Sequence, residues 1–193
     1  MLDNISRYRV LLASKSPRRR ELLKMLDIPF EIAEAIEVDE TYPADMPPRE
    51  VPLYLSALKA KAYSELIHSN ELVITADTIV INNGDILGKP RDVDQAAAML
   101  RAMSGHTHTV VTGVSLTSAA KQVSFDVTTD VVFAFLTSEE IAYYVNNYKP
   151  LDKAGAYGIQ EWIGAVAVSG IEGSFYNVMG LPIHQLYRKL SCF

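Results

Sequence analysis

The 193-residue chain has a single cysteine, and this scarcity excludes an internal disulfide. Because Cys192 has no second thiol to pair with, the composition fits a reducing compartment. No run approaches about 18 consecutive apolar residues, and the first residues lack the basic and apolar regions of a signal peptide. We therefore expect a cytoplasmic protein that is neither exported nor inserted in a membrane.

An excess of basic residues is also missing. The chain has 18 Lys+Arg against 23 Asp+Glu, a formal net charge of -5, whereas proteins that grip a nucleic-acid backbone usually carry a basic excess. This disfavours a nucleic acid as partner but leaves room for a local basic pocket. Long linkers, low-complexity tracts and internal repeats are absent too. We expect one continuous domain over residues 1–193.

The chain does contain alternating signals for strands and helices. Strands are expected at residues 9–13, 72–76 with a continuation over 79–81, 107–116 and 123–135, with a weaker candidate at 30–38. Helices are expected from Pro17, after Pro52, over 94–103, from about 137 to 147, and from about Pro182. Segment 155–180 is expected to form strands and loops. Because hairpin signals accompany the interleaved elements, the class is mixed α/β.

Two finer expectations follow from the same patterns. The turn residues at 82–85 tolerate positive φ and predict a hairpin. In the strand 123–135, alternation from Val123 to Phe135 places the odd-numbered residues on one face.

The first candidate site is the polar corner between the first strand and the first helix. Ser14 and Ser16 supply hydroxyl groups there, and Ser16 is a good N-cap. A helix N-terminus presents unpaired N–H groups and a partial positive charge, to which Arg18 and Arg19 add their guanidinium groups. Phosphate is the anion that fits best. A solvated basic turn capped by Ser16 remains the alternative.

The second candidate site is Asp77, which we expect where an apolar strand ends. Open α/β sheets present side chains from that position to a ligand crevice. An ionised carboxylate at that position must be solvated, paired or bound to a metal, because burying it alone is too costly. Asp39 and Glu40 add hard oxygen ligands of the kind that Mg²⁺ takes. The alternatives are an Asp77 that caps a turn and a solvated acidic turn at 39–40.

Three lysines and one glutamine complete the candidates. Lys59, Lys89 and Lys153 each project from a well-defined backbone beside Ala, Pro or Gly, although a solvated lysine is the usual case. Gln160 closes the Gly-rich segment 155–160, which permits close approach to a planar ligand. Its amide offers both a donor and an acceptor, the pairing that a uracil or thymine edge needs. An incidental glutamine in a loop is the alternative.

Taken together, these segments resemble the Maf family of nucleoside triphosphate pyrophosphatases from Leu11 to Leu190. The matching motifs, in chain order, are 12–19 (LASKSPRR) with 21–23 (ELL), 38–40 (VDE), 59–62 (KAKA), 76–78 (ADT), 87–90 (LGKP), 103–106 (MSGH), 152–160 (DKAGAYGIQ) and 180–182 (GLP). The chain departs from the family pattern at Glu161 and Trp162, where members commonly place a Gly.

The resemblance implies hydrolysis of a nucleoside triphosphate to the monophosphate and pyrophosphate, with Mg²⁺ or Mn²⁺ as cofactor. It implies a mixed twisted sheet with flanking helices, in two lobes around a central cleft, similar to the inosine triphosphatases. Within the family, Thr after the Asp and Gln at the end of the Gly-Ile-Gln motif mark the branch that acts on dTTP and UTP, as distinct from 7-methyl-GTP. Thr78 and Gln160 match the dTTP/UTP branch.

The same resemblance implies roles for individual residues. By this resemblance Asp77 is the proton acceptor, residues Arg18, Thr78 and Gln160 bear on substrate choice, and the catalytic cleft is lined by Ser14, Arg19, Glu40, Lys59 and Lys89. Our own hypothesis adds that Glu40 and Asp77 hold the metal ion or help a water attack the α-phosphorus, and that Lys59 and Lys89 join Asp77 in the catalytic set. The substrate-binding residues that we expect are Ser14, Ser16, Arg18, Arg19, Thr78 and Gln160. Whether Asp77 acts as base, metal ligand or both stays open at this stage.

Two rival functions also stay open. A nucleotide-binding regulator of cell division without significant catalysis is suggested by the family's association with arrest of septum formation. Tight nucleotide binding without hydrolysis in the presence of Mg²⁺ or Mn²⁺ would favour it. Nucleic-acid binding through Arg18–Arg20 is disfavoured by the net charge. The oligomeric state, with a homodimer among the options, and the choice between standard and modified nucleotides are also open.

Overall fold

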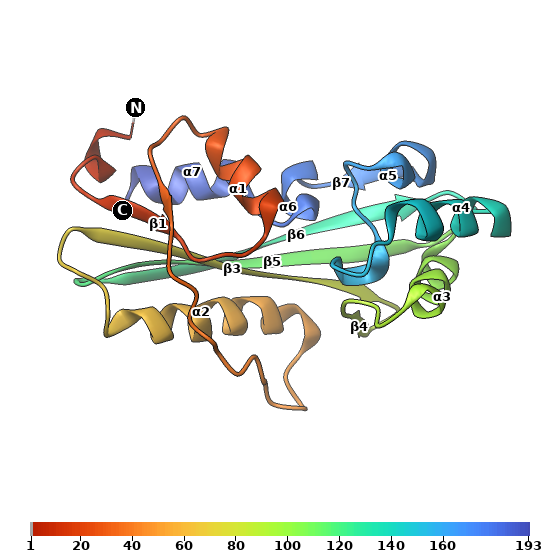
Figure 1. Ribbon diagram of the computed structural model, residues 1–193, viewed down its shortest axis with the longest axis horizontal. Helices are drawn as coiled ribbons and strands as arrows, with labels where there is room; N and C mark the ends of the chain where they lie inside the picture. The colour runs from red at the N-terminus through yellow and green to blue at the C-terminus, as the bar shows by residue number, and fades with distance from the viewer. Residues whose placement is uncertain (1) are drawn as a thin grey trace. The chain divides into compact units, whose positions relative to one another are not determined.

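The computed structural model describes residues 2–193, and it has the mixed α/β architecture that the sequence predicts (Figure 1). Within these residues, strands hydrogen-bond in the order β2 (Glu31–Ile32), β1 (Arg9–Leu12), β3 (Glu71–Asn82), β5 (Thr107–Ser118), β6 (Gln122–Phe133) and β7 (Val168–Glu172), and β4 (Asp85–Leu87) pairs with β3 beside that path. The chain divides into two compact units. Unit 1 comprises the residues up to Asp77, Thr112–Val127 and Gly180–Phe193, and unit 2 comprises Thr78–Val111 and Thr128–Met179. Across residues 2–193, no helix combines the length and apolarity needed to cross a membrane.

The elements divide between the units as follows. Unit 1 contains η1 (Asp3–Ile5), β1 (Arg9–Leu12), α1 (Pro17–Lys24), β2 (Glu31–Ile32), η2 (Pro48–Glu50), α2 (Val51–Ser64) and α7 (Ile183–Ser191). Unit 2 contains β4 (Asp85–Leu87), α3 (Val93–Met103), α4 (Ser138–Tyr148), η3 (Ala154–Ala156), α5 (Trp162–Ala167), β7 (Val168–Glu172) and α6 (Phe175–Met179). Both units receive residues from β3 (Glu71–Asn82), β5 (Thr107–Ser118) and β6 (Gln122–Phe133).

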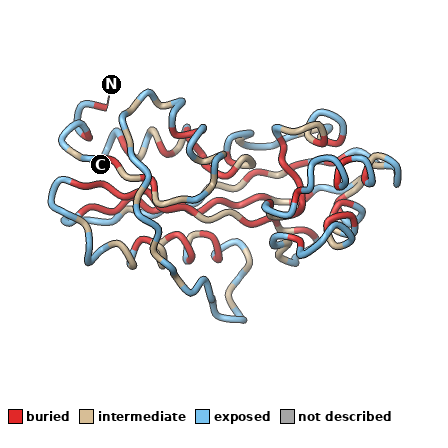
Figure 2. The backbone as a smooth tube through the Cα atoms, in the orientation of Figure 1, coloured by how far each residue is buried: buried red, intermediate tan, exposed pale blue. Residues whose placement is uncertain are grey.

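Unit 1 is organised around the parallel strands β1, β2 and β3. Leu12 on β1 lies opposite Ile32 on one side and Ile74 on the other. Helix α2 covers one face of these strands, and α1 and α7 cover the other (Figure 1). Figure 2 shows that the buried residues follow the strands and the helix faces turned toward them. Leu22 and Leu23 attach α1 to this core, and burial of each side chain stabilises the fold by roughly 1.5–3 kcal/mol.

Gly113 on β5 determines how closely α2 approaches its strand. A Cβ at this position would lie 2.3 Å from the carbonyl carbon of Pro52 and 2.4 Å from the backbone nitrogen of Leu53. Because these atoms are backbone, any larger residue would push the start of α2 away. Pro52 is tolerated in the first helical turn, where no backbone N–H is needed. The close approach sets the position of the helix that carries Lys59.

Unit 2 has a hydrophobic core of its own. It gathers residues from strands and helices that are distant in the sequence, including Val80, Leu100, Val131, Phe133, Ile141, Tyr144, Tyr157 and Ile163. Aromatic rings occupy its centre, where Phe133 meets Tyr157 edge-on with the ring centroids 5.0 Å apart. Large aromatic side chains dominate the energetics of such cores. Tyr157 is buried in this core, and Trp162 packs against it.

His108 is buried in this core. Its Nε2 lies 2.8 Å from the hydroxyl oxygen of Tyr157, and its ring meets Phe133 edge-on at 4.8 Å. Burial lowers the pKa of His108 to about 4, so the imidazole is neutral at neutral pH. Burial also raises the pKa of Tyr157. The contact attaches the segment that leads to Gln160 to strand β5.

Several local predictions are confirmed. Ser16 caps α1, and its side chain accepts a hydrogen bond from the backbone of the first turn. The hairpin between β3 and β4 turns through Asn83 and Gly84, which have φ values of 51° and 90°. The helix expected from about residue 137 is α4, and Thr137 and Glu140 form a capping box at its start. In each case a short-range hydrogen bond or a dihedral preference determines the local structure, and the residues responsible are neighbours in the sequence.

The predicted strand end at Asp77 is wrong. Strand β3 continues from Glu71 to Asn82 without interruption, so Asp77 lies in its interior. Backbone hydrogen bonds between strands do not involve the side chain, so a strand can continue through an aspartate if the carboxylate has a partner. Asp77 has such a partner in Lys59, which local sequence does not reveal.

The predicted extent of two strands is also corrected. Within the weak strand candidate 30–38, only Glu31–Ile32 forms a strand, and residues 33–38 form no regular element. Phe135 does not share the buried face of β6, and it is 87% exposed. Strand β6 ends at Phe133, so the alternation no longer applies two residues later. The ring of Phe135 instead lies against Gly105, where a Cβ would come within 2.5 Å of it.

Helices α5 and α6 occupy the segment expected to form only strands and loops. They contain 6 and 5 residues, which is too short for a helical period to show in the sequence. A cap signal for α6 was nevertheless present. The backbone N–H of Asn177 donates to the hydroxyl of Ser174 at 3.3 Å.

Candidate active site

The polar corner after β1 forms at the start of α1. The Ser16 hydroxyl oxygen accepts from the backbone N–H of Arg19 at 3.4 Å, and the Ser14 hydroxyl oxygen accepts from the backbone N–H of Ser16 at 3.2 Å. Both serines use an acceptor site in these bonds, so each O–H can still act as a donor. Arg18 lies in the same turn and is partly buried. The positive end of the helix dipole adds to its charge.

Arg19 connects this corner to β3 and to the start of the C-terminal segment. Its Nη1 donates to the carbonyl oxygen of Ala76 at 2.8 Å, and its Nε donates to that of Gly180 at 2.8 Å. Burial lowers the pKa of the Arg19 guanidinium, and the nearby Asp77 carboxylate opposes this shift. Arginine nevertheless remains charged at neutral pH. The corner and Asp77 therefore lie together within unit 1.

Lys59 on α2 lies between two carboxylates. Its Nζ is 2.6 Å from Oδ1 of Asp77 and 2.9 Å from Oε2 of Glu40. The side chains of Lys59 and Asp77 are only 17% and 14% exposed, whereas that of Glu40 is 52% exposed. The Asp77 carboxylate has so little contact with water that it needs a partner, because burying an unpaired charge is costly. Packing of α2 on the sheet supplies that partner.

The same two carboxylates fit a divalent cation. Glu40 and Asp77 both contact one ammonium group, so their oxygens point toward a common position. Mg²⁺ prefers such hard oxygen ligands and often binds one or two carboxylates together with water and substrate phosphate. Among residues 2–193, no group of three or more His, Cys, Asp or Glu side chains is arranged to hold a metal ion.

Three predicted site residues belong to unit 2. Thr78 lies on β3 and is partly buried, Lys89 is exposed after β4, and Gln160 is exposed in the turn before α5. The backbone N–H of Gly155 donates to the carbonyl oxygen of Gly88 at 3.1 Å. This bond joins the loop that contains Lys89 to the segment that ends in Gln160.

Comparison with known proteins places these residues in a family. Residues 9–193 match the family described as Maf-like protein. A dTTP/UTP pyrophosphatase of Porphyromonas gingivalis is 53% identical over 195 residues, which cover 100% of this chain and 98% of that protein. This chain belongs to the Maf-like protein family.

Further relatives of this Maf-like protein have the same name. A dTTP/UTP pyrophosphatase of Parabacteroides distasonis is 51% identical over 193 residues and 100% of both chains. One of Flavobacterium johnsoniae is 45% identical over 190 residues, which cover 98% of this chain and 97% of that protein. Among solved structures, the Ham1 protein of Staphylococcus aureus is 16% identical, with a TM-score of 0.49 over 65% of this chain and 72% of that chain.

In this member of the Maf-like family, the three lysine candidates have different environments. Lys59 and Lys153 are largely buried and form ion pairs, so the solvated interpretation is wrong for both. Lys89 is exposed. Glu161 follows Gln160 in the chain, and the Tyr144 hydroxyl contacts both Glu161 and Gly158, but the sequence patterns reveal neither residue as part of this turn. The signal that could have found Glu161 is its position directly after the Gly-Ile-Gln motif.

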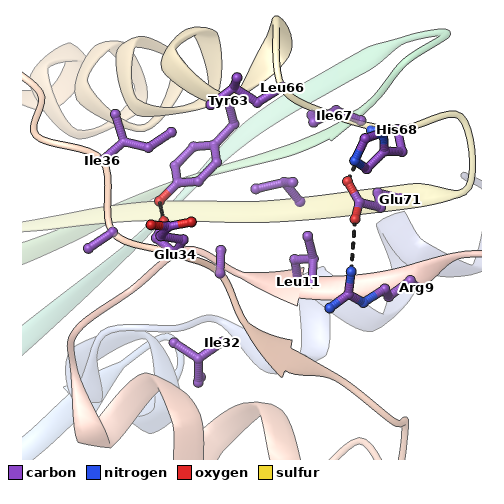
Figure 3. A pocket seen from close by; sticks show the side chains of 13 residues that line it. Arg9, Leu11, Ile32, Glu34, Ile36, Tyr63, Leu66, Ile67, His68 and Glu71 are labelled. Atoms are coloured by element: carbon purple, nitrogen blue, oxygen red, sulfur yellow. Dashed lines mark hydrogen bonds and ion pairs between the residues drawn. The ribbon is translucent and has the colours of Figure 1, made fainter.

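A groove of about 550 Å³ lies elsewhere in unit 1 (Figure 3). Its walls are mostly apolar and include Ile32 and Leu66. Arg9 and Glu71 form an ion pair of 3.2 Å at one end, and the Tyr63 hydroxyl donates to a backbone carbonyl at the other. Its lining includes none of the predicted site residues.

Proposed function

We propose that this protein hydrolyses dTTP and UTP to the corresponding monophosphate and pyrophosphate. The relatives that are 51–53% identical over the whole chain bear the name of this activity. The structural observation that carries the proposal is the meeting of Arg19, Lys59 and Asp77 within unit 1. Phosphoryl transfer to water needs chiefly charge neutralisation and positioning, which cationic side chains beside a carboxylate can supply.

The corner at the start of α1 is suited to hold the phosphate groups. Ser14 and Ser16 can donate their O–H groups to phosphate oxygens, because their hydrogen bonds with the backbone use only acceptor sites. Arg18 adds positive charge where the helix dipole already favours an anion. Arg19 links the corner to β3 through its hydrogen bond to the carbonyl oxygen of Ala76. Lys89 is proposed as a further cationic group of the catalytic set.

Asp77 is proposed to accept the proton of the attacking water. The water oxygen forms a bond to the α-phosphorus while the bond from that phosphorus to the bridging oxygen breaks, and pyrophosphate leaves. Lys59 holds the Asp77 carboxylate in one orientation through the 2.6 Å contact. Its charge also offsets part of the negative charge that the substrate brings.

Glu40 and Asp77 are proposed to hold Mg²⁺ or Mn²⁺. When bound, the cation neutralises charge on the phosphate oxygens. Support for this assignment comes from the convergence of the two carboxylates on the Lys59 ammonium.

Thr78 and Gln160 are proposed to set the preference for a pyrimidine base. The Gln160 amide can both donate to and accept from the edge of uracil or thymine. Its exposure leaves the amide accessible to a ligand. We further propose that residues 1–193 act as one Maf-type domain in the cytoplasm.

The test is pyrophosphate release from a panel of standard and modified nucleoside triphosphates with Mg²⁺ or Mn²⁺. We expect dTTP and UTP to react fastest and to give the monophosphate with pyrophosphate, without nucleoside diphosphate or inorganic phosphate as first products. Tight binding of UTP without any hydrolysis would contradict the proposal and favour the regulator of cell division.

A further inference from the structure

The turn that carries Gln160 is held at both ends by one buried tyrosine. The backbone N–H of Gly158 donates to the Tyr144 hydroxyl oxygen at 3.0 Å, and that hydroxyl donates in turn to Oε2 of Glu161. The backbone N–H of Glu161 donates to the Gly158 carbonyl oxygen at 2.9 Å and closes the turn. Burial, together with the bond to Glu161, raises the pKa of Tyr144, so the phenol remains a donor at neutral pH.

The second oxygen of Glu161 is bound as well. Nζ of Lys153 lies 3.1 Å from Oε1 of Glu161 and 2.7 Å from Oδ1 of Asp152. The Lys153 side chain is only 9% exposed, and that of Glu161 is 20% exposed. Buried ion pairs of this kind contribute little net stability, but removal of one partner leaves a charge that is poorly compensated. The Glu161 carboxylate is thus fixed through both of its oxygens.

The Glu161 carboxylate and the Gln160 amide lie against the same face of the turn, at Gly158. A Cβ at Gly158 would lie 2.9 Å from Cδ of Glu161 and 3.0 Å from Nε2 of Gln160. Both side chains therefore rest against one bare Cα. Glu161 and Gln160 share this small surface, so the position of one limits the positions open to the other.

We propose that Glu161, held by Tyr144 and Lys153, is a positioning residue that orients the Gln160 amide and thereby sharpens discrimination between bases. The inference rests on the proposed function, in which Gln160 recognises the pyrimidine edge. A site built around hydrogen bonds rejects an analogue that leaves its polar groups unpaired, provided that those groups are held in place. The Tyr144 and Lys153 contacts hold the turn in place here.

The test compares kcat and KM for UTP and GTP in Tyr144→Phe and Glu161→Gln. Tyr144→Phe removes both hydrogen bonds of the hydroxyl group, and Glu161→Gln removes the charge of the carboxylate, while each variant keeps the approximate size of the side chain. We expect the ratio of kcat/KM for UTP over GTP to fall by at least about tenfold, mainly through a higher KM for UTP. Tyr148→Phe is the matched control, because Tyr148 stacks on Tyr144 on the same helix with the ring centroids 5.0 Å apart. The control should keep the wild-type ratio.

Gly158→Ala perturbs the turn by a second route. The added methyl group would displace the Gln160 amide and the Glu161 carboxylate, which are the movable ends of flexible side chains. We expect the same loss of discrimination, and thermal unfolding identifies any variant that is not folded at the assay temperature. An unchanged UTP-to-GTP ratio in the folded variants among Tyr144→Phe, Glu161→Gln and Gly158→Ala would overturn the inference.

Binding of α,β-methylene analogues of UTP and GTP separates this inference from the proposed function. Titration calorimetry gives the ratio of the two affinities without any turnover. A wild-type protein that prefers the UTP analogue but hydrolyses no nucleotide contradicts the proposed function alone, and the affinity ratios of the variants then decide the inference. A wild-type protein without preference for the UTP analogue overturns the inference directly.

Discussion

Nζ of Lys59 lies 2.6 Å from Oδ1 of Asp77, although 18 residues separate them in the chain. The contact links helix α2 to the middle of strand β3 and lets a carboxylate lie where a purely apolar strand would otherwise be expected. Both side chains are largely buried, so their attraction is screened less than that of a surface pair. The same ammonium reaches Glu40 at 2.9 Å. Lys59 thus organises both proposed metal ligands.

Replacement of Lys59 should therefore impair catalysis. We expect Lys59→Met to lower kcat for pyrophosphate release from UTP by about 10² to 10³, the usual effect of removing one preorganised charged donor. Lys61→Met is the control, because Lys61 lies on the same helix and is exposed. Turnover near the wild-type value in folded Lys59→Met protein would remove Lys59 from the catalytic set.

Asp77→Asn should abolish pyrophosphate release, because an amide cannot accept the proton of the attacking water or bind a divalent cation as a carboxylate does. The measurement is release of pyrophosphate from UTP with saturating Mg²⁺ or Mn²⁺. Asp126→Asn changes an exposed carboxylate on β6 of the same unit and should leave activity unchanged. Full activity in Asp77→Asn would show that another group activates the water.

Arg19→Ala should affect both turnover and stability. The variant loses two hydrogen bonds from a charged donor to backbone carbonyls, for which we expect a destabilisation of about 2 kcal/mol, and kcat should fall by about 10² to 10³. Arg19→Lys should recover only part of both, since an ammonium cannot reproduce the guanidinium fork. Urea unfolding and pyrophosphate release check the two effects, with exposed Arg20→Ala as the control. Wild-type stability in Arg19→Ala would show that these two hydrogen bonds do not hold the corner to β3.

Gln160→Ala should narrow the preference for UTP over GTP, because the base then loses the partner of its polar edge. Ratios of kcat/KM for the two nucleotides measure the effect. Gln122→Ala, at an exposed position on β6, provides the control for loss of a surface amide. An unchanged preference would exclude Gln160 from base recognition.

Stability should fall in mild acid because of His108. Burial lowers its pKa from 6.5 to about 4, so the unfolded chain takes up a proton at a higher pH than the folded protein does. The contribution of neutral His108 to the free energy of unfolding is fully present above pH 6.5. It is lost as the pH falls from 6.5 to about 4, and the total loss is about 3 kcal/mol.

Urea unfolding between about pH 7 and pH 4 tests this, with His108→Gln expected to show a shallower pH dependence than the wild type. His184→Gln removes an exposed imidazole and should reproduce the wild-type slope. Equal slopes for His108→Gln and the wild type would indicate that other groups cause the acid sensitivity.

Much of the local structure could be predicted because short-range interactions determine it. The Ser16 cap, the Asn83–Gly84 turn and the Thr137–Glu140 capping box each depend on residues no more than three positions apart. Helix α5 could not be predicted in this way. Gly164 in α5 lies so close to Ile159 that a Cβ there would clash with the Ile159 carbonyl oxygen, so α5 packs directly on the preceding turn.

The candidate site was predictable as a set of residue types but not as an arrangement. The sequence alone determined the mixed α/β class and the cationic corner, since these follow from periodicity and from the order of neighbouring residues, and its motifs carried the resemblance to the Maf family. Only the tertiary structure decided that Lys59 pairs with Asp77 and that Tyr144 holds the turn of Gln160. Such pairings depend on how helices pack on a sheet, and the distance between residues far apart in the chain has no signature in local sequence.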